Sequence, residues 1–295
     1  CMALNSIGKN SICVQEKELL DRYKYLDPNN RVISFEKYQT IHPDFKIELF
    51  IITDAHSSSR IGSNLQTLSE KSNELLFIDH HPAPKELAAI HCIDSSKAAT
   101  GELVGELIKA LNVPYTKEIS LSLYTAILID TSSFRYPTVT HKTHELVAEL
   151  LKTGLSSTEA YNKIYGDKEI SYLKLLGNVL VNTNSNKDRT ISWLSLTLND
   201  LKHFNIDAED THAFVNHLLI LNNIKIGCMF RELDKNTIKV SFRAAGNIDV
   251  GIMAQAMGGG GHNHSAATIL KGKLNQIIKD VVYKLELMLK NHSSK

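Results

Sequence analysis

The chain has 295 residues, of which 43% are hydrophobic and 22% are charged, and its formal net charge is +1. A chain of this length exceeds a typical single core, so we expect a globular protein of two domains. A broad nucleic-acid-binding surface needs a strong excess of basic residues, which this balanced charge excludes. Any nucleic-acid substrate should therefore be short, and we expect no long duplex partner.

The cysteines and the apolar segments bear on the cell compartment. No Cys-x-x-Cys pair occurs among Cys1, Cys13, Cys92 and Cys228, so neither a zinc site nor a disulfide framework is indicated. No apolar stretch approaches the roughly 20 residues of a membrane span, and no charged-then-apolar leader opens the chain. The sequence therefore predicts a cytoplasmic protein without a membrane partner.

The N-terminal segment is predicted to form a helix and then a short strand. Residues 11–25 carry apolar positions at roughly helical spacing, and the turn-forming residues 27–30 end this pattern. Residues 31–35 are typical of a short strand.

From residue 47 onward, strand-like and helical segments alternate. Apolar runs at 47–54, 75–78 and 126–131 are typical of strands, and helical patterns occupy 100–111 and 143–153. This alternation is the rhythm of βαβ units, so we expect an α/β fold built on a parallel sheet.

The domain boundary is predicted near residue 180. Residues 157–180 are helical in pattern and contain no proline, so we expect them to close the first domain. The polar run 182–189 is predicted to be a hairpin turn, because residues of strand-like composition flank it. We therefore place one domain at 1–180 and a second at 181–295.

The apolar runs end at three aspartates, namely Asp54, Asp79 and Asp130, and His80 and His81 follow Asp79 directly. If the strands are parallel, these side chains meet at the carboxyl edge of the sheet, where open α/β sheets bind ligands. Carboxylate oxygens with imidazole nitrogens, and no thiolate, suit Mn²⁺ or Mg²⁺ better than a structural Zn²⁺. The alternative is that each aspartate only caps the following helix, which is the simpler interpretation for one aspartate but not for three.

The Asp79-His80-His81 segment suggests different roles for its two imidazoles. An imidazole beside a carboxylate can bind a divalent metal while the acid fixes the orientation and tautomer of the ring, and the adjacent histidine then meets a phosphate. Two adjacent histidines in a loop are more often surface residues than part of a binding site. The prediction therefore depends on the aspartates that are expected to lie close to them.

The second domain is predicted to hold a helix near 208–221, strands at 224–231 and 237–243, and the glycine run Gly258–Gly261 followed by His262. Successive glycines let backbone N–H groups approach an anion closely, and the histidine adds a donor. The alternative is a flexible loop. We favour an anion site, because a loop without a function need not place four glycines directly before a histidine.

Taken together, these motifs resemble the DHH-family phosphoesterases of the oligoribonuclease (nanoRNase) and pAp-phosphatase type. The matching segments are Asp54 with 59–62, 79–82, 130–136 and 258–262, and their order and spacing cover nearly the whole chain. The resemblance implies a parallel-sheet DHH domain, a smaller α/β DHH-associated domain and a cleft between them.

The resemblance also implies roles for individual residues. It assigns metal binding to Asp54, His80, Asp130 and Asn5, with Mn²⁺ or Mg²⁺ as the ion, and catalysis to His81 and Asp79. Its substrate-binding residues are Arg243, Gly259, Gly260, Gly261 and His262. Arg243 would make a bidentate contact with a phosphate, although without the resemblance a surface arginine is as good an interpretation.

The N-terminus departs from the family pattern. The family motif His-x-x-x-Asp-x-Asp-Ser-Ile-Gly aligns with Ala3–Gly8, which puts Ala3 and Asn5 in place of its two aspartates and its histidine before Cys1. By this alignment one metal keeps Asp54, His80, Asp130 and a neutral Asn5, and the other keeps Asp54 alone. Either the chain is truncated or altered, or half of the metal centre is lost. We expect at most one tightly bound metal and slow turnover.

Three functions therefore compete. The first is a metal-dependent hydrolase of short oligoribonucleotides or pAp. The second is a phosphohydrolase of another small nucleotide or of polyphosphate. The third is a nucleotide-binding protein without turnover, which the altered N-terminal motif keeps open. A homodimer is compatible with each of the three functions.

Overall fold

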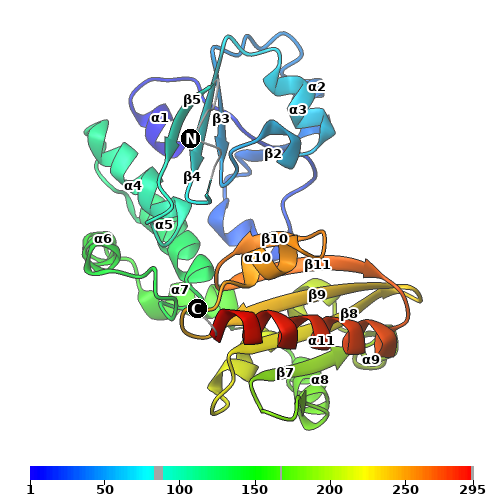
Figure 1. The fold of residues 1–295 in the computed structure, drawn as a ribbon. Helices are drawn as coiled ribbons and strands as arrows, with labels where there is room; N and C mark the ends of the chain where they lie inside the picture. The colour runs from blue at the N-terminus through cyan, green and yellow to red at the C-terminus, as the bar shows by residue number, and fades with distance from the viewer. Residues whose placement is uncertain (83–88, 167, 294–295) are drawn as a thin grey trace. The chain divides into compact units, whose positions relative to one another are not determined.

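The computed structural model describes residues 1–82, 89–166 and 168–293 (Figure 1). The chain forms two compact units, Cys1–Asp167 and Lys168–Lys295, and each is described by itself. No helix among the described residues is long and apolar enough to span a membrane.

A three-stranded parallel sheet lies at the centre of the first unit, with the strand order β3-β4-β5. Its strands are β3 (Leu49–Thr53), β4 (Glu74–Asp79) and β5 (Ile90–Ile93). Ile52 and Phe77 are buried on these strands and belong to one apolar cluster. Because β3 and β4 are parallel, both end at the same edge of the sheet. The predicted parallel sheet is therefore confirmed.

A second, two-stranded parallel sheet pairs β1 (Cys13–Gln15) with β2 (Val32–Ser34). The strand predicted at 31–35 is thus confirmed as β2. The helix predicted at 11–25 is wrong, because this segment forms β1 and the 3-10 helix η1 (Asp21–Leu26). Glu16 in this segment accepts hydrogen bonds from the backbone N–H groups of Asn64 and Leu65, so a tertiary contact overrides the helical spacing.

Helices fill the rest of the first unit. They are α1 (Met2–Ser6), α2 (Phe35–Ile41), α3 (Ser63–Ser69), α4 (Thr100–Ala110), α5 (Lys117–Asp130), α6 (His141–Leu151) and α7 (Ser157–Tyr165). Helices α4 and α6 confirm the helical patterns at 100–111 and 143–153. The strand predicted at 126–131 is wrong, because these residues form the C-terminal end of α5. Much of α5 is buried, including the adjacent Ile127 and Leu128, so its apolar run lacks the polar face that marks a surface helix.

The second unit contains a six-stranded mixed sheet with the order β10-β11-β9-β8-β7-β6. Its strands are β6 (Asn184–Ser185), β7 (Ile191–Leu196), β8 (Ile226–Asp234), β9 (Thr237–Ala244), β10 (Gly260–His262) and β11 (Ser265–Lys271). Helices α10 (Val250–Gln255) and α11 (Leu274–Ser293) pack in one apolar cluster with the sheet. A second cluster contains α8 (Ile170–Val181), α9 (Leu198–Phe204) and the 3-10 helix η4 (Phe214–Ile220).

The two units divide after Asp167 rather than near residue 180. Helix α8 packs in the second unit, because its fully buried Leu175 and Val179 share a cluster with Leu194 and Phe214. A hairpin of β6 and β7 does form here, but β6 lies within the run 182–189 that was predicted as the turn. The strand predicted before this run is wrong, because Val179–Val181 are helical.

The remaining expectations for the second unit differ in detail. The strands predicted at 224–231 and 237–243 are confirmed as β8 and β9. The single helix predicted near 208–221 is replaced by two 3-10 helices, η3 (Ala208–Thr211) and η4.

Candidate functional site

Asp54 lies directly after β3 and has a left-handed backbone, with φ +64°. Its N–H donates to the carbonyl oxygen of Ile78 on β4 (2.9 Å), which holds the turn against the neighbouring strand. Its Oδ1 accepts a hydrogen bond from the buried Thr100 hydroxyl at the start of α4 (2.7 Å). The side chain nevertheless remains 61% exposed, so its carboxylate is accessible.

His80 follows the last residue of β4 and is buried. Its Nδ1 donates to the carbonyl oxygen of Lys97 (3.2 Å), because a carbonyl can only accept. In the neutral ring the lone pair is therefore on Nε2, which lies 2.8 Å from Oδ2 of Asp130 and 3.7 Å from Oδ1 of Asp54. A lone pair directed at two carboxylates is repulsive unless a proton or a metal cation lies between them.

The pKa of His80 reflects the same surroundings. Burial would lower the pKa of the ring, but the contact with Asp130 outweighs burial and raises it. The position between the two carboxylates thus favours positive charge, which is also the condition for binding a cation.

Asp54, His80 and Asp130 each offer a ligand atom, and these atoms lie within 4.8 Å of one another. They come from the end of β3, the end of β4 and the end of α5. Two carboxylates and one imidazole, with the tautomer of the imidazole fixed by a backbone carbonyl, fit a divalent cation such as Mn²⁺ or Mg²⁺. The structure therefore brings together the three side chains that the sequence predicted to meet.

Asp79, the last residue of β4, is fully buried and bonds to two histidines rather than lying in this group. Its Oδ1 accepts from Nδ1 of His81 (2.6 Å) and from the His81 backbone N–H (3.1 Å), and its Oδ2 accepts from Nδ1 of His56 (2.9 Å). Burial would raise the pKa of the Asp79 carboxyl, but the hydrogen bonds from His81 and His56 hold this pKa well below its usual range. The carboxylate is therefore ionised and oriented by two rings.

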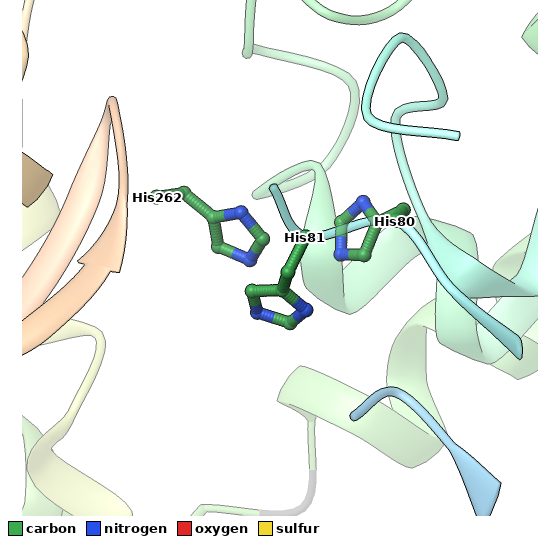
Figure 2. Close-up of side chains that lie close together, drawn as sticks. All are labelled: His80, His81 and His262. Carbon is green, nitrogen blue, oxygen red and sulfur yellow. The ribbon is translucent and has the colours of Figure 1, made fainter. Parts of the chain in front are cut away.

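Figure 2 shows the rings of His80 and His81, whose centroids are 4.9 Å apart at an interplanar angle of 70°. Ligand atoms of Asp54, Asp79 and His81 also lie within 4.8 Å of one another. In that group Nδ1 of His81 donates to Asp79, and a nitrogen that carries this proton has no lone pair for a metal. We therefore interpret the group of Asp54, Asp79 and His81 as a hydrogen-bond network and the group of Asp54, His80 and Asp130 as the candidate ligand set.

Asn5 is engaged elsewhere. Its Nδ2 donates to the carbonyl oxygen of Ser11 (3.1 Å), and its Oδ1 accepts from the Ser11 backbone N–H (2.9 Å). Both polar atoms of the side chain thus close a local turn after α1. The Oδ1 atom that a metal would use is thus already a hydrogen-bond acceptor, and the metal role implied for Asn5 stays a prediction.

The candidate residues of the second unit lie on β9 and β10. Arg243, on β9, donates from Nε to Oδ1 of Asn216 (3.1 Å) and from Nη1 to the carbonyl oxygen of Phe242 (2.9 Å), so its guanidinium orientation is fixed. His262, also drawn in Figure 2, lies on β10, the edge strand of the sheet.

The glycine run has a structural role that the sequence does not reveal. The N–H groups of Gly258 and Gly259 donate to the carbonyl oxygens of Gln255 and Ala254 at the end of α10. A Cβ on Gly259 would lie 2.1 Å from the Ala267 oxygen, and one on Gly261 would lie 2.5 Å from the Ala266 Cα. A Cβ on Gly260 would meet nothing within 4 Å. Close packing against β11 therefore explains Gly259 and Gly261, whereas Gly258 and Gly260 have open space beside them.

Comparison with known proteins supports the two-part organisation. The model of the DHH family, N-terminal domain, matches residues 4–129, and the model of the DHHA1 domain matches residues 190–286. A solved structure of an exopolyphosphatase-related protein from Bacteroides fragilis superposes with a TM-score of 0.88 at 25% sequence identity. That alignment covers 98% of this chain and 87% of the Bacteroides chain.

Two curated relatives carry the name bifunctional oligoribonuclease and PAP phosphatase NrnA. The protein from Thermus thermophilus is 32% identical over 67% of this chain, and the match covers 59% of that relative's length. The protein from Bacillus subtilis is 27% identical over 83% of this chain and 76% of the relative.

Proposed function

Since the chain belongs to the DHH family of phosphoesterases, we propose that it hydrolyses phosphoester bonds in short oligoribonucleotides or in pAp. The names of the Thermus and Bacillus relatives support this choice of substrates. The observation that carries the proposal is the convergence of Asp54, His80 and Asp130, because a phosphoesterase of this kind needs carboxylate and imidazole groups that hold a metal beside the substrate.

Asp54, His80 and Asp130 would hold a Mn²⁺ or Mg²⁺ ion in this reaction. Such an ion supplies Lewis acidity toward a phosphoryl oxygen and lowers the pKa of bound water. Thr100 orients the Asp54 carboxylate, and the Lys97 carbonyl oxygen keeps the Nδ1 proton of His80 in place, so that Nε2 is the ligand atom. These contacts fix the site before the substrate binds, which lowers the entropic cost of assembling it.

In this proposal His81 acts on the substrate, and Asp79 acts through His81. Asp79 occupies Nδ1 of His81, so chemistry at this ring has to use Nε2. From Nε2 the ring accepts a proton when neutral and donates a hydrogen bond to a phosphoryl oxygen when protonated. Asp79 orients this ring and fixes its tautomer, as a buried carboxylate does for a catalytic histidine in other hydrolases.

The second unit contributes phosphate binding in this proposal. Arg243 is oriented by Asn216 and Phe242, and an oriented guanidinium is a strong partner for a phosphate oxygen. His262 and the open side of Gly260 add a ring donor and a close backbone approach.

The solved Bacteroides structure favours a second candidate. The Bacteroides protein is described as related to exopolyphosphatases, and it shares nearly the whole fold with this chain. A phosphohydrolase of inorganic polyphosphate is therefore the alternative. An oriented arginine fits either substrate, so assay of both is needed.

A turnover assay separates these candidates. The purified protein is incubated with pAp, a trinucleotide RNA, polyphosphate and pyrophosphate, each with Mn²⁺, with Mg²⁺ and after treatment with a chelator. We expect phosphate release from pAp and nucleotide release from the RNA, loss of both after chelation, and recovery on adding Mn²⁺. Cleavage of polyphosphate alone would select the alternative, and no cleavage at all would contradict the proposed function.

A further inference from the structure

His56 lies in the loop between β3 and the 3-10 helix η2 (Ser58–Arg60), and no pattern in the sequence singles it out. Its ring is 19% exposed and contacts the fully buried carboxylate of Asp79. From this contact we infer that His56 is a positioning residue, which sets the orientation of His81 through Asp79. The inference deepens the proposed function, because it rests on a role for His81 in the reaction.

The two carboxylate oxygens of Asp79 are divided between two rings. Oδ1 accepts from the ring and the backbone N–H of His81, and Oδ2 accepts from the His56 ring. A buried carboxylate without a partner for one oxygen is strongly disfavoured, so both donors are needed to keep this rotamer. His56 therefore holds the side of the carboxylate that does not face His81.

Loss of the His56 donor has a predictable consequence. Oδ2 of Asp79 would be left buried without its hydrogen bond. The carboxylate would then rotate toward another donor, or a water molecule would enter and donate to Oδ2. Either change lengthens or bends the 2.6 Å contact between Oδ1 and Nδ1 of His81. The His81 ring then samples other orientations, and its Nε2 no longer meets the substrate in one geometry.

The chain offers a conservative replacement and a matched control. In His56→Asn the amide nitrogen can take the place of the ring Nδ1, so the hydrogen bond to Asp79 is kept. His56→Ala removes it, and His56→Gln, whose amide lies one bond further out, replaces the alanine variant if that variant does not fold. His91→Ala is the control, because His91 is an exposed histidine on β5 whose Nδ1 contacts only the carbonyl of its near neighbour Ala89 among the interactions that the described residues show.

The first readout is the ring N–H resonance of His81 in ¹⁵N-histidine NMR spectra, which needs no substrate. We expect this hydrogen-bonded signal in the wild type, in His56→Asn and in His91→Ala, and its loss by exchange in His56→Ala. A role confined to stabilising the loop would leave the His81 signal in place in folded His56→Ala. Persistence of the signal there would overturn the inference.

The second readout is activity in a double-mutant cycle. A misplacement of about 1 Å at a reacting group can cost about 100-fold, so we expect a kcat loss of roughly 10- to 100-fold in His56→Ala and near recovery in His56→Asn. In a His81→Ala background the same change should cost less than about twofold, because the positioned ring is already gone. Equal losses in both backgrounds, or no rescue by asparagine, would contradict the inference. An inactive wild type would count against the proposed function alone, and the NMR signal would still decide the role of His56.

Discussion

The candidate residues of the two units are built into the fold in different ways. In the first unit, Asp54, His80 and Asp130 are side chains at the ends of structural elements, and they offer ligand atoms within 4.8 Å of one another. Hydrogen bonds with Thr100 and with the Lys97 carbonyl oxygen orient Asp54 and His80. In the second unit, Gly259 and Gly261 are packed directly against the backbone of β11. From this difference we expect isosteric substitutions of the three side chains in the first unit to lower catalytic activity with little loss of stability. Substitutions of the packed glycines in the second unit should mainly lower the stability of the fold.

The substitution Asp54→Asn tests the expectation for the first unit most directly. Asparagine is isosteric with aspartate and tolerates the left-handed backbone at this position, so the fold should survive. Loss of one carboxylate from the ligand set should lower kcat with Mn²⁺ by more than about 100-fold, because changing a residue that only supports a metal ligand already costs roughly 10- to 100-fold. Steady-state kinetics and thermal melting measure the two effects separately.

Asp44→Asn is the matched control, since Asp44 is an exposed turn residue. It should change neither kcat nor Tm. If Asp54→Asn lost stability as well as activity, the distinction between the two units would break down.

Arg243→Ala tests the side-chain contribution of the second unit. A hydrogen bond to a charged group is worth about 1.5–3 kcal/mol, so KM should rise about 10- to 100-fold with a smaller change in kcat if the contact is made equally in the ground and transition states. The control is Arg189→Ala, an exposed arginine in the turn between β6 and β7. An unchanged KM in Arg243→Ala would remove this residue from the substrate site.

The paired variants Gly259→Ala and Gly260→Ala test the glycine run. The new methyl group at 259 would overlap the Ala267 oxygen, and overpacking of this kind costs about 1–3 kcal/mol, so Tm should fall by several degrees. A methyl group at position 260 would have no neighbouring atom within 4 Å, so Tm should stay unchanged. Substrate affinity should fall, because the methyl group would occupy the open space beside Gly260. Equal melting temperatures for the two variants would show that the run is not packed as described.

The convergence of Asp54, His80 and Asp130 was predictable from the sequence, although one of the reasons was wrong. Asp54 and Asp79 do end parallel strands, but Asp130 ends helix α5. A short apolar run such as Ala126–Ile129 reads equally well as a buried strand or as a buried helix, because periodicity does not separate them. Asp130 still reaches His80, from the C-terminal end of α5.

Other features were beyond sequence reasoning for physical reasons. His56 is a single histidine in a serine-rich loop, and only the turn after β3 brings it to Asp79. The packing of Gly259 against β11 depends on strand pairing between residues that the glycine pattern does not specify. Asn5 was assigned by alignment with a motif, and its bonds to Ser11 are a local contact that the alignment does not reveal.

The central claim is that Asp54, His80 and Asp130 hold a divalent cation, and Mn²⁺ binding followed by electron paramagnetic resonance tests it without any substrate. Wild type, Asp130→Asn and the control Asp44→Asn are titrated with Mn²⁺, and the free ion is measured. We predict saturable binding in the wild type and in Asp44→Asn, and affinity at least about 10-fold weaker in Asp130→Asn. Equal affinity in all three proteins would contradict the claim.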